Sequence, residues 1–181
     1  MRVIAGSAKG HKLVAPKSDL TRPVLGQVKE AIFNILYNVE GERVLDLFAG
    51  SGAVGIEALS RGAAHCIFVE YAKPAVACTH RNLHRCHLLE HATVFHLRVS
   101  AAIKKLNGAS TSFDLIFVDP PYEQGLVKKT LDQLSTSNLL ASDGRIIVEH
   151  HPHEPIGDIA GFALTDTRRY GQTHVSFLKR S

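Results

Sequence analysis

The chain has 181 residues, 45% of them hydrophobic and 21% charged, which predicts one folded domain with a substantial core and excludes disordered and fibrous proteins. Its start lacks an apolar signal-peptide core, and no segment offers the roughly 18 uncharged apolar residues of a membrane helix, so we expect a cytoplasmic protein without membrane contact. The net charge of +4 is by itself only a mild indication of an anionic partner.

The positive charge is concentrated at the front of the chain. Residues 1–29 hold six Lys or Arg residues against one acid, a local charge of +5. A basic region of this kind is typical of phosphate-backbone binding, although a solvated arm has the same composition. Residues 1–16 alternate as a loose β-hairpin, and apolar residues at helical spacing then predict a helix from about 24 to 39, with Lys29 and Glu30 on its outer side.

From residue 43, short apolar runs alternate with helical stretches. The predicted strands are 43–48, 66–70, 92–97, 113–119 and 145–150, and the predicted helices are 53–61, 73–88, 100–106 and 125–137. Strands that are apolar on both faces and separated by helices favour a parallel sheet covered on both sides. Residues 162–170 and 174–179 predict an antiparallel hairpin at one edge. The fold class is therefore α/β, Rossmann-like and mostly parallel, preceded by a small hairpin and helix.

A glycine-rich turn, Gly50-x-Gly52-x-x-Gly55, follows the first of these strands. Glycines there let backbone N–H groups at a helix start face a ligand. Glu70 ends the next strand, where a carboxylate can accept hydrogen bonds from both hydroxyls of a ribose. The pattern also matches the dinucleotide fingerprint of a dehydrogenase. However, Asp46 would repel a pyrophosphate and would suit the positively charged amino-acid end of S-adenosylmethionine, which favours a methyl donor.

The second motif is Asp119-Pro120-Pro121-Tyr122, at the end of an apolar strand. Consecutive prolines fix φ and leave carbonyls that can only accept hydrogen bonds. The Asp119 carboxylate and the Pro120 carbonyl could hold the two N–H bonds of an exocyclic amine, while Tyr122 stacks on an extruded base, a contact worth about 1 to 3 kcal/mol. Alignment rather than a strong base would supply the rate. The alternative is a rigid turn in which Tyr122 only packs.

With these motifs in register the sequence resembles class I methyltransferases, and more narrowly the bacterial 16S ribosomal RNA guanine-966 N2-methyltransferase family. The resemblance extends over almost the whole chain. It includes Arg2 to Gly6 with Lys9-Gly10, Thr21-Arg22-Pro23, Val28 to Leu36, Asp46 to Ala63, Asp119 to Tyr122, and Arg168-Arg169-Tyr170-Gly171. It implies methyl transfer from S-adenosylmethionine to N2 of a guanine in 16S ribosomal RNA within an assembling small subunit. Residues 1–40 would form an RNA-binding appendage to a methyltransferase domain at 41–181.

The resemblance also implies site residues. Catalytic roles fall to Asp119, Pro120 and Tyr122. Cofactor contacts fall to Asp46, Phe48, Ala49, Gly50, Ser51, Gly52, Glu70, Tyr71, Val99, Ser100 and Asp119. RNA contacts fall to Arg2, Lys9, Lys12, Arg22, Lys29, Arg168 and Arg169. The chain departs from the family at Val24 to Gln27, where polar residues are usual, and at Arg98-Val99-Ser100, where an acid or amide often contacts adenine; backbone groups or Ser100 would serve there.

Two other hypotheses about the function remain open. An adenine-N6 DNA methyltransferase could use the same turn, although about 40 residues before the core are few for a target-recognition domain. A non-catalytic RNA-binding assembly factor is the third possibility. We expect no metal: Cys78, His80, His84, Cys86, His87 and His91 lack paired ligand spacing and fit a solvated helix face, and His150-His151-Pro152-His153 fits an exposed loop. The three cysteines should be reduced thiols, and we expect a monomer without a protein partner.

Overall fold

The computed structural model describes residues 1–16, 24–122 and 124–181. Within these residues the elements are α1 (Val24–Leu36), β1 (Arg43–Asp46), α2 (Ala53–Ser60), β2 (His65–Glu70), α3 (Lys73–Arg85), a 3-10 turn η1 (Leu89–His91), β3 (Ala92–His96), α4 (Val99–Gly108), β4 (Phe113–Val118), α5 (Leu126–Ser135), β5 (Leu140–His150), β6 (Phe162–Tyr170) and β7 (Thr173–Arg180). The described strands form one sheet in the order β3-β2-β1-β4-β5-β7-β6.

The sheet is parallel from β3 to β5 and ends in an antiparallel pair, which confirms the predicted fold class. Every predicted strand and helix after residue 43 is present within a few residues. The largest difference is the start of β5 at Leu140 rather than 145. Strand β5 passes through Asp143 and Gly144 with an irregular register, since Phe113 of β4 pairs with Leu140 and Leu115 pairs with Arg145. The backbones approach closely there, and a Cβ on Gly144 would lie 3.0 Å from the Phe113 carbonyl oxygen.

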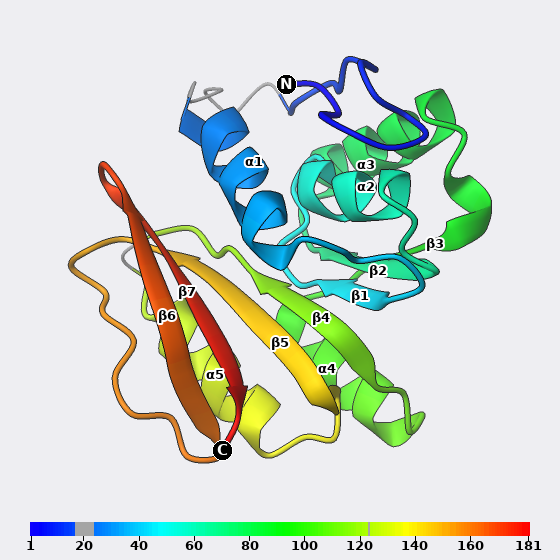
Figure 1. The fold of residues 1–181 in the computed structure, drawn as a ribbon. Helices are drawn as coiled ribbons and strands as arrows, with labels where there is room; N and C mark the ends of the chain where they lie inside the picture. Colours follow the sequence, from blue (N-terminus) through cyan, green and yellow to red (C-terminus); the bar gives the residue numbers. More distant parts are fainter. Residues whose placement is uncertain (17–23, 123) are drawn as a thin grey trace.

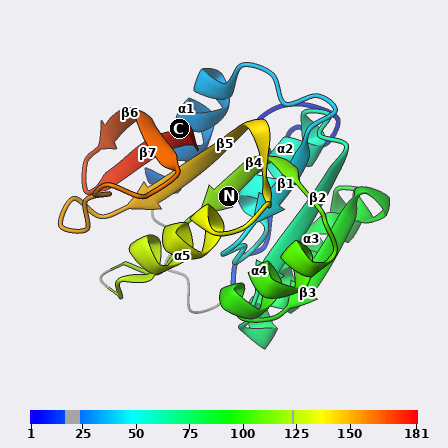
Figure 2. The same ribbon diagram turned by 90° about the horizontal axis from the view of Figure 1, so that it is seen from below.

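Helices cover both faces of the sheet, with α1 on one side and α4 and α5 on the other (Figures 1 and 2). One hydrophobic cluster joins Phe33 of α1, Ile56 of α2 and Leu83 of α3 to the sheet. A second cluster lies under α4 and α5 and includes Ile103 and Leu131. In the described part of the chain, no helix has both the length and the apolar character that crossing a membrane requires.

The N-terminal segment forms the predicted hairpin in a loose form. Arg2 and Lys12 make an antiparallel bridge, and the N–H groups of Val3 and Leu13 donate to the carbonyl oxygens of His11 at 3.0 Å and Met1 at 2.9 Å. The hairpin packs on the end of α2, where Ser60 accepts backbone N–H bonds from Ser7 at 2.7 Å and from Ala8 at 2.9 Å. Buried apolar residues of 1–16 belong to the same hydrophobic cluster as α1 and α2. Residues 1–16 and α1 therefore share a core with the rest of the described chain.

A buried carboxylate fixes this arrangement. Glu57 of α2 is fully buried and accepts backbone N–H bonds from Ile4 at 2.8 Å and Ala5 at 3.0 Å. Lys29 Nζ and Arg61 Nε each lie 2.9 Å from its oxygens. Burial alone would raise the pKa of Glu57, but the bonds from Lys29, Ile4 and Arg61 hold that pKa below its usual value. A carboxylate buried with this many donors is a strong constraint on the segments that supply them.

The same contact shows that the prediction for Lys29 was wrong. Lys29 was expected on the outer side of its helix as an RNA contact, yet only 3% of it is exposed. Its ammonium donates to the Arg2 carbonyl oxygen at 3.1 Å in addition to pairing with Glu57. Helical spacing identifies the apolar face of a helix, but it does not reveal a distant buried acid that draws a cation inward.

Two glycines of the N-terminal segment provide a test of this docking. Gly6 and Gly10 both have positive φ, 80° and 87°, but a Cβ on Gly6 would overlap the Ser60 carbonyl whereas a Cβ on Gly10 meets no atom within 4 Å. Gly10→Ala should lower the free energy of unfolding by about 1 to 2 kcal/mol through backbone strain. Gly6→Ala should cost about 1 to 3 kcal/mol more, because Ser60 must move. Urea unfolding of both variants measures the difference, and equal losses would show that the segment is not held against α2.

Candidate active site

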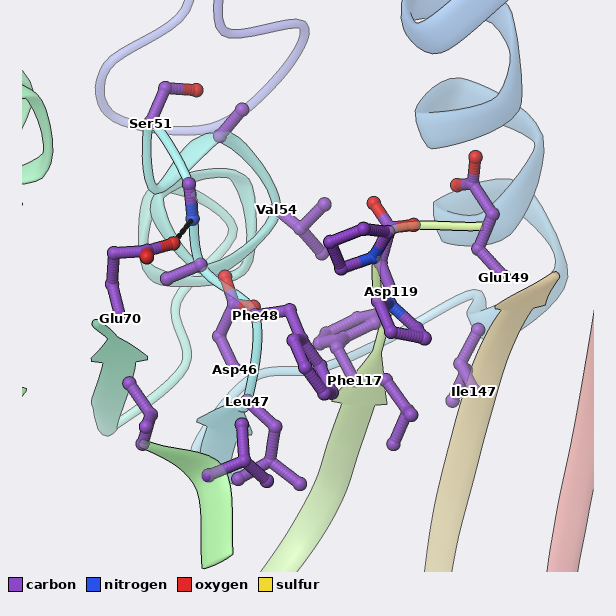
Figure 3. A pocket seen from close by; sticks show the side chains of 18 of the residues that line it. Asp46, Leu47, Phe48, Ser51, Val54, Glu70, Phe117, Asp119, Ile147 and Glu149 are labelled. Carbon is purple, nitrogen blue, oxygen red and sulfur yellow. Dashed lines mark hydrogen bonds between the residues drawn. The ribbon is translucent and has the colours of Figure 1, made fainter. Parts of the chain in front are cut away.

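A pocket of about 540 Å³ opens at the carboxyl ends of β1, β2, β4 and β5. Its ionisable and hydroxyl-bearing lining residues are Lys29, Asp46, Ser51, Glu70, Tyr71, Asp119, Tyr122 and Glu149. Figure 3 shows Asp46 and Glu70 beside the glycine-rich loop in one half, and Asp119 and Glu149 in the other. Ligand sites of open parallel sheets lie at this edge, so the pocket is the candidate active site.

The glycines of the loop have separate structural roles. Gly50 and Gly52 have φ values of 52° and 77°, in the left-handed region that L residues rarely adopt. Gly55 lies in α2, where a Cβ would be 2.7 Å from the sulfur of Cys66 and would overlap the ring of Phe68. The third glycine therefore lets α2 pack directly on β2. Gly52, which was predicted to contact a cofactor, does not line the pocket and shapes the turn instead.

Glu70 holds the loop in place. Its Oε2 accepts the Gly50 N–H at 3.0 Å, the bond drawn in Figure 3, and its Oε1 accepts N–H bonds from Tyr71 at 2.8 Å and Ala72 at 2.7 Å. A carboxylate has about four lone-pair sites, so it can accept further donors from a ligand. Tyr71 is 58% exposed at the mouth of the pocket, with the guanidinium carbon of Arg98 5.4 Å from its ring centre.

Asp46 is the most deeply buried acid of the pocket, with 4% of its surface exposed. Desolvation by burial raises its pKa to about 7; the nearby Glu70 carboxylate adds to the rise, and the Gly55 N–H, 3.2 Å away, opposes it. A buried carboxylate in this state is stabilised in its charged form when a cation binds beside it. This chemistry agrees with the predicted role of Asp46 near a positively charged ligand group.

The remaining predicted cofactor residues divide into two groups. Lining positions are taken by Phe48, Ala49, Gly50, Ser51, Tyr71 and Val99, and by Leu97, which the sequence analysis did not select. Ser100 is exposed and does not line the pocket. Its predicted contact is therefore not supported, because α4 begins at Val99 and its first turn directs Ser100 outward.

Asp119, Pro120 and Tyr122 all line the second half of the pocket. The Tyr122 hydroxyl lies 3.2 Å from Glu149 Oε1, to which it donates, and 3.0 Å from Thr173 Oγ1. Burial raises the pKa of Tyr122 to about 12; the Thr173 contact opposes this rise and the Glu149 carboxylate adds to it. The phenol is therefore neutral at physiological pH and cannot act as a base. Its ring, 5.6 Å from that of His151, is held as a wall.

Two residues of the site were missed in the sequence. Glu149, at the end of β5, is 8% exposed and lines the pocket, but it was hidden in a strand recognised only by its apolar residues. Asn82 of α3 is fully buried: its Nδ2 donates to Val14 O at 2.9 Å and Ser51 O at 2.8 Å, and its Oδ1 accepts the Val14 N–H at 2.8 Å. Asn82 thereby joins the N-terminal segment to the glycine-rich loop. Its only sequence signal was a polar residue on the apolar side of a helix.

The predicted RNA-binding residues lie on two surfaces. Arg2, Lys9 and Lys12 are exposed on the N-terminal segment, and Arg168 and Arg169 are exposed on β6. Arg168 pairs with Asp166 at 2.7 Å. The prediction for Arg22 lies outside the described residues. Strand β6 ends beside Thr173, the contact of Tyr122, so the second surface adjoins the pocket.

The histidines that were considered as metal ligands are spread along the molecule. His80, His84 and His87 are exposed on and after α3. Across the residues that the structure describes, no group of three or more His, Cys, Asp or Glu side chains is arranged to hold a metal ion. All three cysteines are buried, and burial raises the pKa of the Cys66 thiol.

The chain has relatives along its whole length. Residues 1–179 match the family described as conserved hypothetical protein 95. A putative rRNA methyltransferase of Bacillus subtilis, YlbH, is 40% identical over 185 residues, which cover 99% of each chain. The ribosomal RNA small subunit methyltransferase D of Escherichia coli is 37% identical over 150 residues, covering 82% of this chain and 74% of that protein.

Solved structures show the same fold. A putative methyltransferase of Escherichia coli, yhhF, has a TM-score of 0.87 and 31% identity, with 99% of this chain and 97% of that chain covered. A more distant putative methyltransferase, SMU.776, solved in complex with SAH, has a TM-score of 0.67 and 20% identity over 84% of this chain and 48% of its own. The latter likeness concerns the fold alone.

The raised pKa of Asp46 predicts a gain in stability when its charge is removed. Because the pKa is higher in the folded than in the unfolded chain, ionisation disfavours folding, and the cost grows as the pH rises from about 4 to about 7. Asp46→Asn keeps an oxygen for the Gly55 N–H. It should raise the free energy of unfolding at pH 8 by up to about 4 kcal/mol, and by much less at pH 5.

Urea unfolding at both pH values measures this gain. Asp143→Asn is the matched control, since it makes the same substitution at an exposed position. The control should show no gain that grows with pH. A gain for Asp46→Asn that is the same at pH 5 and pH 8 would contradict the burial of a costly charge.

Proposed function

The chain belongs to the family of ribosomal RNA small subunit methyltransferase D, and from this premise we propose that it methylates the N2 amine of a guanine in 16S ribosomal RNA within the assembling small subunit. It is a class I methyltransferase that uses S-adenosylmethionine and acts on ribosomal RNA. The observation that carries the finer proposal is that Asp119 and Pro120 line the same pocket as Asp46 and Glu70. We place this activity in the cytoplasm.

The residues of the first half fit S-adenosylmethionine. Glu70 would accept hydrogen bonds from the ribose hydroxyls, and Asp46 is the buried anion that would neutralise the ammonium of the amino-acid end. Tyr71, Leu97 and Val99 provide apolar surface at the pocket mouth for the adenine. When bound, the cofactor supplies a methyl group made electrophilic by its sulfonium. An acidic, partly buried half-pocket is suited to such a cationic ligand and unsuited to a pyrophosphate.

The second half would hold the target amine. The Asp119 carboxylate and the Pro120 carbonyl accept hydrogen bonds, and the following Pro121 has no N–H, so this turn offers acceptors to both N–H bonds of an amino group. That contact would orient the nitrogen lone pair toward the cofactor half. Apolar side chains of Phe48, Val54 and Phe117 also line the pocket and would exclude water from the space between the amine and the methyl group. Asp119 would also take up the proton that the methylated amine loses.

The chain's own phenol would position the base rather than move a proton. Tyr122 is neutral at physiological pH and is fixed by Glu149 and Thr173. A held aromatic ring is a stacking surface for a base extruded from RNA, worth about 1 to 3 kcal/mol. This role requires an RNA backbone bound nearby, for which Arg168 and Arg169 on β6 are suitably exposed.

The proposed reaction is tested with labelled S-adenosylmethionine. Small ribosomal subunits that lack the modification, deproteinised 16S RNA and duplex DNA are incubated separately with the protein, and the labelled nucleosides are identified. The proposal expects N2-methylguanosine from the subunits. Label on adenine, or label only in DNA, would show that the target base has been assigned wrongly.

Two substitutions separate chemistry from cofactor binding. Asp119→Ala removes an acceptor of the target amine, so kcat should fall by about 10² to 10³, the usual effect of one lost transition-state hydrogen bond. Its affinity for S-adenosylmethionine should change by no more than about two-fold. Glu70→Ala removes the charged partner of the ribose and the anchor of Gly50, so the cofactor Kd should rise about ten-fold or more. Calorimetry and single-turnover assays measure both, and full activity of the Asp119 variant would remove its proposed role.

The basic N-terminal segment should contribute to RNA affinity through phosphates. Lys9→Gln with Lys12→Gln should weaken binding to 16S RNA and reduce the slope of log affinity against log salt by about 2. Lys128→Gln with Lys129→Gln is the matched control, because these exposed lysines lie on α5, on the opposite face of the sheet. Titrations between about 50 and 200 mM salt compare the pairs. Equal slopes for both pairs would mean that the N-terminal lysines are only solvated.

A further inference from the structure

We propose that Glu149 reads the N1–H group of the target base, so that two carboxylates, Asp119 and Glu149, select guanine over the other bases. Glu149 is a specificity-determining residue on this account. The inference rests on the proposed function, since it takes the methylated amine to lie against Asp119 and Pro120. It goes further because it identifies what distinguishes guanine from adenine, a choice that the Asp-Pro-Pro-Tyr turn alone leaves open.

The sheet places the two acids side by side. Strands β4 and β5 are parallel neighbours, and their register ends on the pair Val118 and Val148. Asp119 directly follows β4, and Glu149 is the next residue of β5. Because side chains alternate along a strand, they face the same side as Phe117 and Ile147, which belong to one hydrophobic cluster. Both acids line the pocket, and Figure 3 shows them in the same half of it.

The Glu149 carboxylate accepts a hydrogen bond from the wall of the pocket. Tyr122 donates its hydroxyl proton to Glu149 Oε1 over 3.2 Å, and the same hydroxyl contacts Thr173 of β7. Glu149 is 92% buried, given its 8% exposure, and a buried carboxylate requires donors. A carboxylate has about four lone-pair sites, so it can accept the Tyr122 hydroxyl together with an N–H donor of a ligand. The Tyr122 ring thus provides the surface on which a base would stack, and its hydroxyl binds the carboxylate that would contact the edge of that base.

The chemistry of the bases makes this pair selective. On its Watson–Crick edge, guanine presents an N1–H donor directly beside its N2 amine. Adenine and cytosine present an amine beside an unprotonated ring nitrogen, and uracil has no exocyclic amine. A carboxylate facing an unprotonated ring nitrogen sets two acceptors against each other in a site largely shielded from water, which is strongly unfavourable. Among the four bases of RNA, guanine is therefore the one that offers an N–H donor to Asp119 and to Glu149 at the same time.

The probe is 2-aminopurine, which keeps the N2 amine of guanine but has no proton on N1. Small subunits are reconstituted with 16S RNA carrying either guanine or 2-aminopurine at the methylated position, once that position has been mapped. The unaltered enzyme should lose at least about 10³ in kcat/KM on 2-aminopurine, as sites built around a substrate N–H do when it is missing. Binding of the subunits themselves should be unchanged.

Glu149→Gln then tests the residue directly. The glutamine amide keeps an acceptor for the Tyr122 hydroxyl and can donate to the unprotonated N1 of 2-aminopurine. Methylation of guanine should fall by about 10² or more, and the preference for guanine over 2-aminopurine should shrink to about ten-fold or less. Cofactor affinity should stay within about two-fold. A merely structural role would instead lower both rates together and leave the preference unchanged.

A matched control and a second variant keep the outcomes separate. Asp119→Asn should lower both rates and preserve the preference, because it alters the amine contact alone. If Glu149→Gln does not fold, Glu149→Asp, which withdraws the carboxylate by one methylene, should reduce the preference in its place. Equal rates on the two bases, or an unchanged preference in the Glu149 variants, would overturn the inference while guanine methylation stands. Failure to methylate guanine in any substrate would instead refute the proposed function.

Discussion

The parallel register of the sheet determines where the chemistry of this protein lies. Strands β1, β2, β4 and β5 run in one direction, so the acids at or next to their carboxyl ends, Asp46, Glu70, Asp119 and Glu149, meet at one edge. Such an edge repels phosphate and attracts cations and N–H donors. Burial raises the pKa of Asp46 to about 7, and the nearby Glu70 carboxylate adds to the rise. A sulfonium cofactor and a base edge rich in donors are complementary to the same feature.

An acidic pocket raises a difficulty for an enzyme whose substrate is a polyanion. The structure separates the acidic pocket from the basic surfaces that could bind RNA. Exposed cations lie on the N-terminal segment and on β6, outside the pocket. The N-terminal segment is not a loose arm, since Glu57 and Ser60 bind its backbone to α2 and Asn82 links it to the glycine-rich loop. The proposed RNA-binding surface and the cofactor loop therefore belong to one core. An RNA backbone could be held by the outer charges while a single base enters the pocket.

Local signals in the sequence were sufficient for most of the fold. Apolar runs, glycines and prolines located the strands, the loop after β1 and the Asp-Pro-Pro-Tyr turn, because these features depend on neighbouring residues. Contacts between distant segments were not accessible in this way. Lys29 turned inward to reach Glu57, and Ser100 turned outward at the first turn of α4. Glu149 and Asn82 were overlooked since each is a single polar residue in an apolar element, and only the register or packing of other elements shows what it meets.

The most direct test of this account is a crystal structure of the protein with S-adenosylhomocysteine and an RNA fragment that contains the target guanine. The account predicts the cofactor product between Asp46 and Glu70. It also predicts guanine N2 at a hydrogen-bond distance of about 3 Å from Asp119 and the Pro120 carbonyl, and guanine N1 at a similar distance from Glu149. A base that turns its Hoogsteen edge to the two carboxylates, or a cofactor product bound away from this edge of the sheet, would contradict it.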